Sequence, residues 1–196
     1  GLQLLATGGM AMAADLKQRG RQVFLDWKLH DIGATVEKAA AAIAATESCD
    51  LITVHAEPQV MRAAVKGRGS ANEMKILGVT VLTSLSGQDL AEMGYGMGVS
   101  ALVERRIRQA VECGTDGVVA SPHEAEIARK IGGPDFLVVT PGVRPAWAEA
   151  NDQARAASPS DALTNGASHL VVGRPITAAG DPREAALRIV GEMSGI

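Results

Sequence analysis

The chain has 196 residues, enough for one domain with a buried core. Its 19 basic and 22 acidic residues give a net charge of −3, with no basic stripe to indicate a nucleic-acid partner. Its apolar runs are too short to span a membrane, and its two cysteines are more typical of reduced thiols than of a disulfide framework. We therefore expect a cytoplasmic protein with neither a membrane nor a nucleic-acid partner.

The predicted elements begin with helical material, because apolar residues from Leu4 to Leu16 recur at a rough helical spacing before Gly20, a helix stop. Short β-branched apolar runs then alternate with helical segments. The predicted strands are residues 22–25, 51–55, 76–82, 117–120, 136–140 and 169–172. The predicted helices are residues 36–46, 58–66, 99–112, 123–131, 159–164 and 182–193. Ser158 before Pro159 is typical of an N-cap followed by proline at the first helical position.

This alternation predicts an α/β protein with a parallel sheet and right-handed crossovers. Six strand–helix units are fewer than the eight of a TIM (β/α)8 barrel. Counted back from the C-terminus, residues 169–172 are strand eight and residues 22–25 are strand three, so strands one and two are missing. We expect a single, partial barrel domain over residues 1–196. The alternative is an open, six-stranded doubly wound sheet.

The polar motifs follow the predicted strands, at the end where barrel enzymes place their sites. Asp26 and Lys28 follow the first predicted strand, and residues at i and i+2 of a strand point to the same face. Asp31 lies further on, where a loop can bring it, or a neighbouring subunit's copy, near a lysine. Such a cluster can hold a charged lysine against a developing negative charge.

Two arginines stand in the loops after strands seven and eight, the usual place of phosphate sites in barrels. Arg144 lies in T-P-G-V-R-P and Arg174 in G-R-P. Glycine lets the backbone approach a ligand closely, and the guanidinium fork fits phosphate oxygens. A single such arginine is more often a solvated surface residue, but the pair predicts a phosphorylated ligand.

The run of residues 26–36, D-W-K-L-H-D-I-G-A-T-V, resembles the signature of the orotidine 5′-phosphate decarboxylase family. The motifs L-T-S, T-P-G-V-R-P, D-Q and G-R-P follow in the order that the family shows. The resemblance covers essentially the whole chain. It implies a barrel-fold carboxy-lyase that forms uridine 5′-monophosphate and CO2 in pyrimidine biosynthesis. It also implies a homodimer that needs no cofactor and no metal.

The same resemblance implies residue roles. Lys28 would stabilise and protonate a C6 carbanion, and Asp26 would lie beside the substrate carboxylate. Asp31 would extend across the dimer interface into the active site of the partner subunit. The implied substrate-binding residues are Thr35, Thr83 and Ser86, and for the phosphate Arg144, Gln153, Gly173 and Arg174. His30 and His55 are weaker candidates, for which a structural hydrogen bond is at least as good an interpretation.

Two alternatives to an active decarboxylase stay open. One is a sugar-phosphate lyase that shares D-x-K-x-x-D and needs Mg²⁺, although that group should lack T-P-G-x-R-P and D-Q. The other is a catalytically impaired fragment that only binds nucleotide. The family's first strand carries an aspartate, and its second strand a lysine, that have no counterpart in this chain. We therefore expect that the 196-residue chain cannot form a competent site without those units, an expectation that full turnover by this chain would contradict.

Overall fold

The computed structural model describes residues 1–70, 73–145, 147 and 157–195. The chain forms two compact units. Unit 1 consists of Gly1–Thr80 and Arg106–Val118, and unit 2 of Val81–Arg105 and Val119–Ile196. Within the described residues, no helix is both long and apolar enough to cross a membrane. The expectation of one barrel domain over residues 1–196 stays a prediction.

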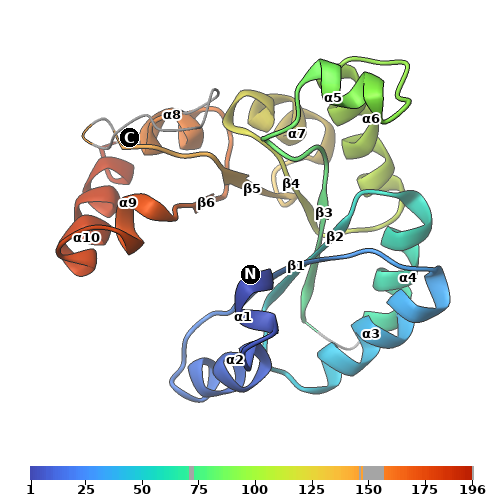
Figure 1. Ribbon diagram of the computed structural model, residues 1–196, viewed down its shortest axis with the longest axis horizontal. Helices are drawn as coiled ribbons and strands as arrows, with labels where there is room; N and C mark the ends of the chain where they lie inside the picture. Colours follow the sequence, from blue (N-terminus) through green and yellow to red (C-terminus); the bar gives the residue numbers. More distant parts are fainter. Residues whose placement is uncertain (71–72, 146, 148–156, 196) are drawn as a thin grey trace. The chain divides into compact units, whose positions relative to one another are not determined.

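Six strands form one sheet whose order follows the chain, from β1 to β6 (Figure 1). They are β1 (Phe24–Leu29), β2 (Leu51–His55), β3 (Lys75–Val79), β4 (Gly117–Val119), β5 (Leu137–Pro141) and β6 (His169–Val171). The pairs β1–β2, β2–β3 and β5–β6 are parallel. A doubly wound sheet reverses its strand order at a switch point, whereas a barrel sheet runs in sequence. The order therefore confirms the barrel-type prediction and excludes the doubly wound alternative.

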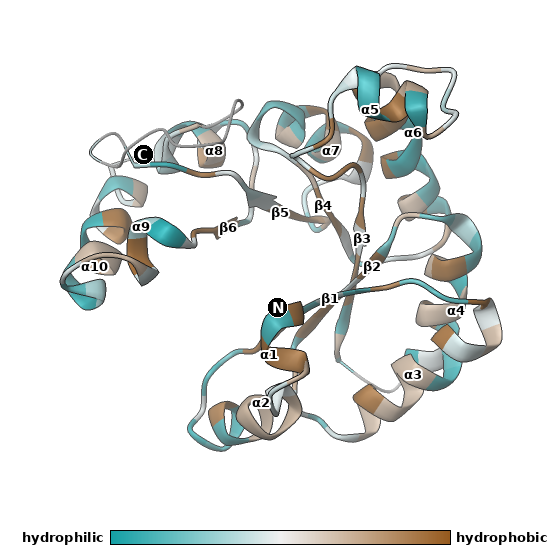
Figure 2. Cartoon of the chain, in the orientation of Figure 1, coloured by the Kyte–Doolittle hydropathy of each residue, from teal (hydrophilic) through white to brown (hydrophobic). Residues whose placement is uncertain are grey.

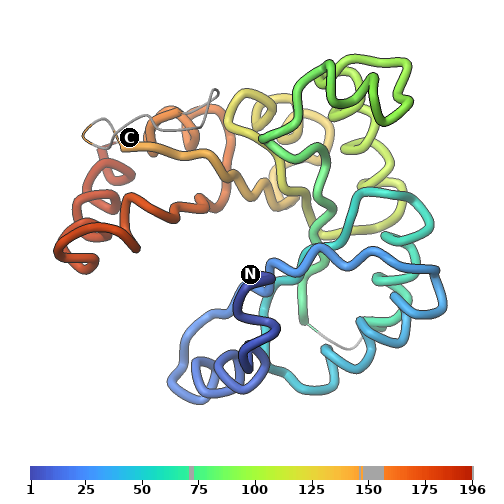
Figure 3. Tube along the Cα trace, in the orientation of Figure 1, coloured from blue at the N-terminus to red at the C-terminus, as the bar shows by residue number. Residues whose placement is uncertain are grey.

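In unit 1, short helices α1 (Leu2–Leu5) and α2 (Gly9–Gln18) precede β1, and helices α3 (Gly33–Ala45) and α4 (Pro58–Arg68) join its three strands. The trace can be followed from β1 through α3, β2 and α4 to β3 in Figure 3. Helices α3 and α4 lie side by side, and a Cβ at Gly67 would stand 2.1 Å from the carbonyl oxygen of Glu37. Only glycine permits this close approach of the two backbones.

The core of unit 1 lies along β2 and β3, which are coloured mostly apolar in Figure 2. Consecutive residues of both strands are buried, among them Ile52, Val54, Ile76 and Leu77. A continuous rather than alternating burial pattern is typical of parallel strands that are covered on both faces. This rigid pair supports the neighbouring strand β1, which carries the charged motif.

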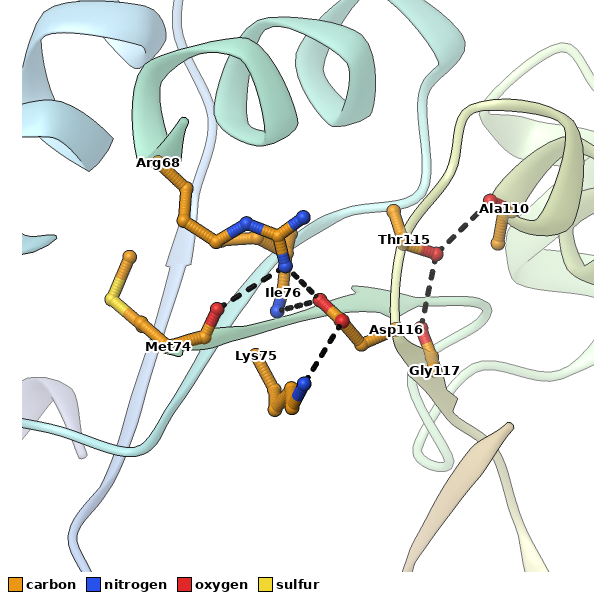
Figure 4. A network of polar contacts seen from close by, with 8 residues as sticks. All are labelled: Arg68, Met74, Lys75, Ile76, Ala110, Thr115, Asp116 and Gly117. Carbon is orange, nitrogen blue, oxygen red and sulfur yellow. Dashed lines mark hydrogen bonds and ion pairs between the residues drawn. The ribbon is translucent and has the colours of Figure 1, made fainter. Parts of the chain in front are cut away.

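A polar network closes the amino-terminal end of these strands (Figure 4). The Asp116 carboxylate, just before β4, pairs with Arg68 at the end of α4 and with Lys75 at 3.6 Å. It also accepts a hydrogen bond of 2.8 Å from the backbone N–H of Ile76. Arg68 donates in addition to the carbonyl of Met74 at 3.2 Å. The network thus fixes α4, β3 and the start of β4 to one another.

Helix α6 (Val99–Glu112) runs from unit 2 into unit 1. The remaining helices of unit 2 are short, apart from the last. They are α5 (Gly87–Glu92), a 3₁₀ turn (Pro122–Glu124), α7 (Ala125–Gly132), α8 (Pro159–Thr164), α9 (Arg174–Thr177) and α10 (Pro182–Met193). The Ser158 side chain accepts a hydrogen bond of 3.1 Å from the Asp161 N–H, which confirms the predicted N-cap.

Strand β1 differs from its prediction in a way that affects the site. It spans Phe24–Leu29 rather than residues 22–25, so Asp26 and Lys28 lie within the strand and not after it. The pairing of β1 with β2 is also irregular between Leu25 and Leu29. Four steps along β1 match only two along β2, because Leu25 faces Ile52 and Leu29 faces Val54. The charged motif is therefore a bulged segment of an otherwise regular sheet.

Candidate active site

The bulge places Lys28 in an unusual backbone conformation. Its φ is +52°, one of two positive values at non-glycine residues in the described parts of the chain. The left-handed region is disfavoured for residues with a Cβ, at a cost of roughly 1–2 kcal/mol. Side chains held in this region concentrate at functional sites, where the surrounding structure maintains the conformation. The backbone itself thus marks Lys28 as a candidate functional residue.

The structure brings Lys28 and Asp26 into direct contact. The Lys28 Nζ lies 2.7 Å from the Asp26 Oδ2, with 26% of the lysine side chain and 35% of the aspartate side chain exposed. An ion pair of this length is a charge-assisted hydrogen bond. The pair is exposed enough for a ligand to reach it. It is also buried enough that solvent screens the attraction between the two charges less than in a surface pair.

Thr53, which no sequence motif singles out, completes this cluster from strand β2. Its side chain is fully buried. The Thr53 hydroxyl lies 2.9 Å from the Asp26 Oδ1, to which it donates, and accepts the Lys28 backbone N–H at 2.9 Å. A threonine inside an apolar strand carries no sequence signal that separates it from ordinary core. Its role becomes visible only when β1 and β2 are paired.

Two histidines and a glutamate lie beside the cluster. The rings of His30 and His55 are 4.8 Å apart, and the His30 Nε2 is 3.1 Å from the Glu57 carboxylate. Burial lowers the pKa of His55 below its ordinary value. The nearby His30, Arg106 and Lys28 lower it further, and the Glu57 carboxylate opposes them. His55 therefore favours its neutral form in the folded protein.

Asp31 and Thr35 lie at the start of α3, and both are exposed. The Asp31 Oδ1 accepts a hydrogen bond of 2.6 Å from the backbone N–H of Ile32, a residue that is 68% exposed. Within the described residues, the ion pair of Lys28 is made with Asp26 and not with Asp31. The chain by itself thus leaves the Asp31 carboxylate at the surface.

In unit 2, Thr83 and Ser86 lie in the segment between β3 and α5. Thr83 is half-buried, and Ser86 is the N-cap of α5. The Ser86 hydroxyl accepts the Asp89 N–H at 3.3 Å and donates to the Asp89 carboxylate at 2.5 Å. This capping box gives Ser86 a structural task that the sequence analysis did not assign. Its role toward substrate stays a prediction.

The loop after β5 carries Arg144 on a fixed backbone. Gly142 has a φ of +82°, which favours glycine there. Val143 then forms a bridge with Ala157, and the Arg144 N–H donates to the Ala157 carbonyl at 2.9 Å. Arg144 is half-buried, and its Nε has no hydrogen-bond partner among the residues that the structure describes.

Gly173 and Arg174 follow β6 at the start of α9, and both are exposed. Gln153 lies outside the described residues. Trp147 donates from Nε1 to the Glu192 carboxylate at 2.8 Å, and the Arg188 guanidinium lies 4.6 Å from the centre of its ring. These contacts attach Trp147 to α10.

Comparison with known proteins gives a consistent result. The family model described as "Orotidine 5'-phosphate decarboxylase / HUMPS family" matches residues 1–189. An orotidine 5'-phosphate decarboxylase of a Caulobacter species is 68% identical over 196 residues, which are 100% of this chain and 85% of the relative. That of Caulobacter vibrioides is 66% identical over 200 residues, with the same coverage. That of Methylobacterium radiotolerans is 54% identical over 194 residues, 99% of this chain and 83% of the relative.

Two solved structures agree in fold. The crystal structure of orotidine 5'-phosphate decarboxylase from Lactobacillus acidophilus matches with a TM-score of 0.80 and 36% identity, over 94% of this chain and 80% of that chain. An uncharacterized conserved protein from Geobacillus kaustophilus matches with a TM-score of 0.82 and 32% identity, over 98% of this chain and 85% of that chain.

Proposed function

The chain belongs to the orotidine 5′-phosphate decarboxylase / HUMPS family, and from this premise we propose that it converts orotidine 5′-monophosphate to uridine 5′-monophosphate and CO2. The identity of 66–68% to two Caulobacter decarboxylases across the whole chain carries this proposal. It makes the protein a carboxy-lyase of pyrimidine biosynthesis. The Asp26–Lys28 pair on the bulged strand β1 supplies the chemistry that the reaction needs.

Lys28 is proposed to act on C6 of the pyrimidine. When the bond between C6 and the carboxylate breaks, its electron pair stays on C6. That pair lies in the plane of the ring, so the ring cannot delocalise it. A fixed ammonium stabilises that charge and then donates its proton to C6, after which the neutral amine regains a proton from solvent. Asp26, 2.7 Å from Lys28 Nζ, holds the ammonium and would face the departing carboxylate. Like charge there disfavours the substrate more than the transition state.

Residues other than the Asp26–Lys28 pair are proposed, on the family resemblance, to supply the substrate contacts away from C6. Arg144 and Arg174 would bind the phosphate, assisted by the Gly173 backbone and by Gln153. The half-buried Arg144, with its unsatisfied Nε in the described structure, supports this assignment. Thr35, Thr83 and Ser86 are likewise proposed to contact the nucleoside. Binding energy from these remote groups can orient the reacting centre.

The arginine assignment predicts a loss of affinity that depends on the phosphate. Replacing Arg144 or Arg174 with alanine is expected to weaken uridine 5′-monophosphate binding about 10- to 100-fold, the usual effect of losing a charge-assisted contact. Binding of uridine, which has no phosphate, should change little. Calorimetric titration measures both, and Arg183→Ala on the exposed face of α10 is the matched control. Equal losses for the two ligands would contradict the assignment.

We also propose a homodimer in which Asp31 completes the partner's site. The exposed Asp31 and the 68% exposed Ile32 support an intermolecular role for this segment. Lys28→Ala and Asp31→Asn proteins, each inactive, are expected to regain activity when mixed. A heterodimer then holds one native site, so recovery should approach about a quarter of the native value. Mixing without recovery, although sedimentation shows heterodimers, would contradict a shared Asp31.

A cytoplasmic location is proposed from the thiols. Cys49 and Cys113 are both unpaired and buried. Burial raises the pKa of Cys49 to about 11, helped by the nearby Asp50 carboxylate and opposed by Lys17. A buried thiol that stays protonated is unreactive and compatible with a reducing compartment.

The decisive test follows the absorbance of orotidine 5′-monophosphate with purified protein to which the family's first two strands have been joined, in buffer with and without a chelator. The expected result is turnover that the chelator leaves unchanged. Turnover of a sugar phosphate that the chelator abolishes would favour the Mg²⁺-dependent lyase instead. Nucleotide binding without turnover in either buffer would favour the impaired binding protein.

A further inference from the structure

The pairing of β1 and β2 leaves a gap in the backbone hydrogen bonds at Lys28. Strand β1 carries two more residues than β2 between its matched positions, so its backbone groups there cannot all find partners on β2. The Lys28 N–H instead donates to a side chain, the Thr53 hydroxyl, at 2.9 Å. The next pair of strands shows no such break, because every residue of β2, Thr53 included, is in register with β3.

The same hydroxyl fixes the Asp26 carboxylate. A threonine hydroxyl has one donor and two acceptor positions. Here the donor is used for the Asp26 Oδ1 at 2.9 Å, while the acceptor takes the Lys28 N–H. The second oxygen of Asp26 meets the Lys28 Nζ at 2.7 Å. Thr53 therefore contacts both members of the ion pair: the backbone of Lys28 and the side chain of Asp26.

We infer that Thr53 is a positioning residue for the reaction: its hydroxyl holds the left-handed backbone of Lys28 and the orientation of Asp26 at once. This inference rests on the proposed decarboxylase function for its kinetic consequence, although the contact itself does not. Thr53 is fully buried within β2, so its hydroxyl is part of the rigid core. Errors of about 1 Å in the placement of a reacting group can cost about 100-fold in rate.

The inference predicts a specific pattern for two substitutions. Thr53→Val keeps the shape of the side chain and removes the hydroxyl, and we expect it to lower kcat about 10- to 100-fold with KM within about 3-fold of native. Thr53→Ser restores the hydroxyl and should bring kcat back to within about 3-fold of native. If Thr53 had only a structural role, Thr53→Val would not lower kcat while leaving KM nearly native.

A second readout does not depend on turnover. The backbone amide signal of Lys28 in a ¹H–¹⁵N NMR spectrum should move in Thr53→Val, as expected for a lost hydrogen bond, and return in Thr53→Ser. Thr115→Val is the matched control, since Thr115 is also buried in unit 1 but donates to backbone carbonyls of Ala110 and Gly117. It should leave both kcat and the Lys28 amide signal of the folded protein unchanged.

The outcomes separate the inference from the function. If native protein decarboxylates and Thr53→Val keeps native kcat, the inference is wrong while the function stands. If protein that also carries the family's first two strands shows no turnover, the function fails, and the Lys28 amide signal still decides the role of Thr53. An amide signal that is the same in native protein and Thr53→Val would overturn the inference in either case.

Discussion

Replacing Lys28 with alanine is expected to lower kcat for decarboxylation by at least about four orders of magnitude, because proton donation and charge stabilisation at C6 are lost together. Stability should change little. Alanine experiences the same left-handed backbone at this position, and Asp26 keeps the hydrogen bond from Thr53. The measurement is the absorbance loss of orotidine 5′-monophosphate at saturating concentration, with urea denaturation alongside.

The matched control for Lys28→Ala is Lys66→Ala. Lys66 is 72% exposed on α4 and pairs with Glu37 at 2.9 Å, away from strand β1. Removing it should leave kcat at the native value and, as for other exposed pairs, alter the free energy of unfolding by less than about 1 kcal/mol. Lys28→Ala activity within about tenfold of native would exclude Lys28 as the proton donor.

Much of the fold is determined by local patterns that can be read from the sequence. Strand β2 (Leu51–His55) and helices α6 (Val99–Glu112), α8 (Pro159–Thr164) and α10 (Pro182–Met193) have the bounds that the sequence predicted. Each combines an apolar repeat with local end signals, such as proline at the first helical positions of α8 and α10. Such signals need no partner from elsewhere in the chain.

Strand β1 shows where local patterns stop being sufficient. Aspartate and lysine are depleted in strands, so Asp26 and Lys28 indicated that the strand had already ended. The strand continues because Thr53 and Asp26 hold the bulge through contacts made across the sheet. The sequence correctly predicted that Asp26 and Lys28 lie side by side. The predicted reason was the regular i, i+2 spacing of a strand. The observed cause is a bulge with a left-handed lysine.

The sequence analysis also predicts no helix at residues 87–92, for a reason different from that for strand β1. Helix α5 (Gly87–Glu92) begins with a readable capping signal, Ser86 followed by Asp89 three residues later. The family resemblance implies a substrate contact for Ser86, whereas the local sequence indicates that it caps a helix. The network around Asp116 could not be predicted at all, because Arg68, Lys75 and Asp116 meet only after α4, β3 and β4 have packed.

That network gives the largest expected effect on stability. Asp116→Asn removes the charge that faces Arg68, whose side chain is only 15% exposed. Leaving one member of a mostly buried pair without its partner costs about 3 kcal/mol or more. For a chain of this length the expected fall in Tm is roughly 6–12 °C. Calorimetry and urea denaturation measure both quantities. Asp15→Asn, which breaks an exposed pair with Arg19, should cost less than about 0.5 kcal/mol.

A double-mutant cycle identifies the cause of the Asp116 effect. If the cost comes from the orphaned guanidinium, Arg68→Met combined with Asp116→Asn should be no less stable than Asp116→Asn alone, because the second change removes the unpaired charge. Strictly additive losses would show that the two side chains act independently, through the Ile76 N–H and the Met74 carbonyl. In every variant, kcat per folded molecule should stay native, since this network lies at the opposite end of the parallel strands from Lys28.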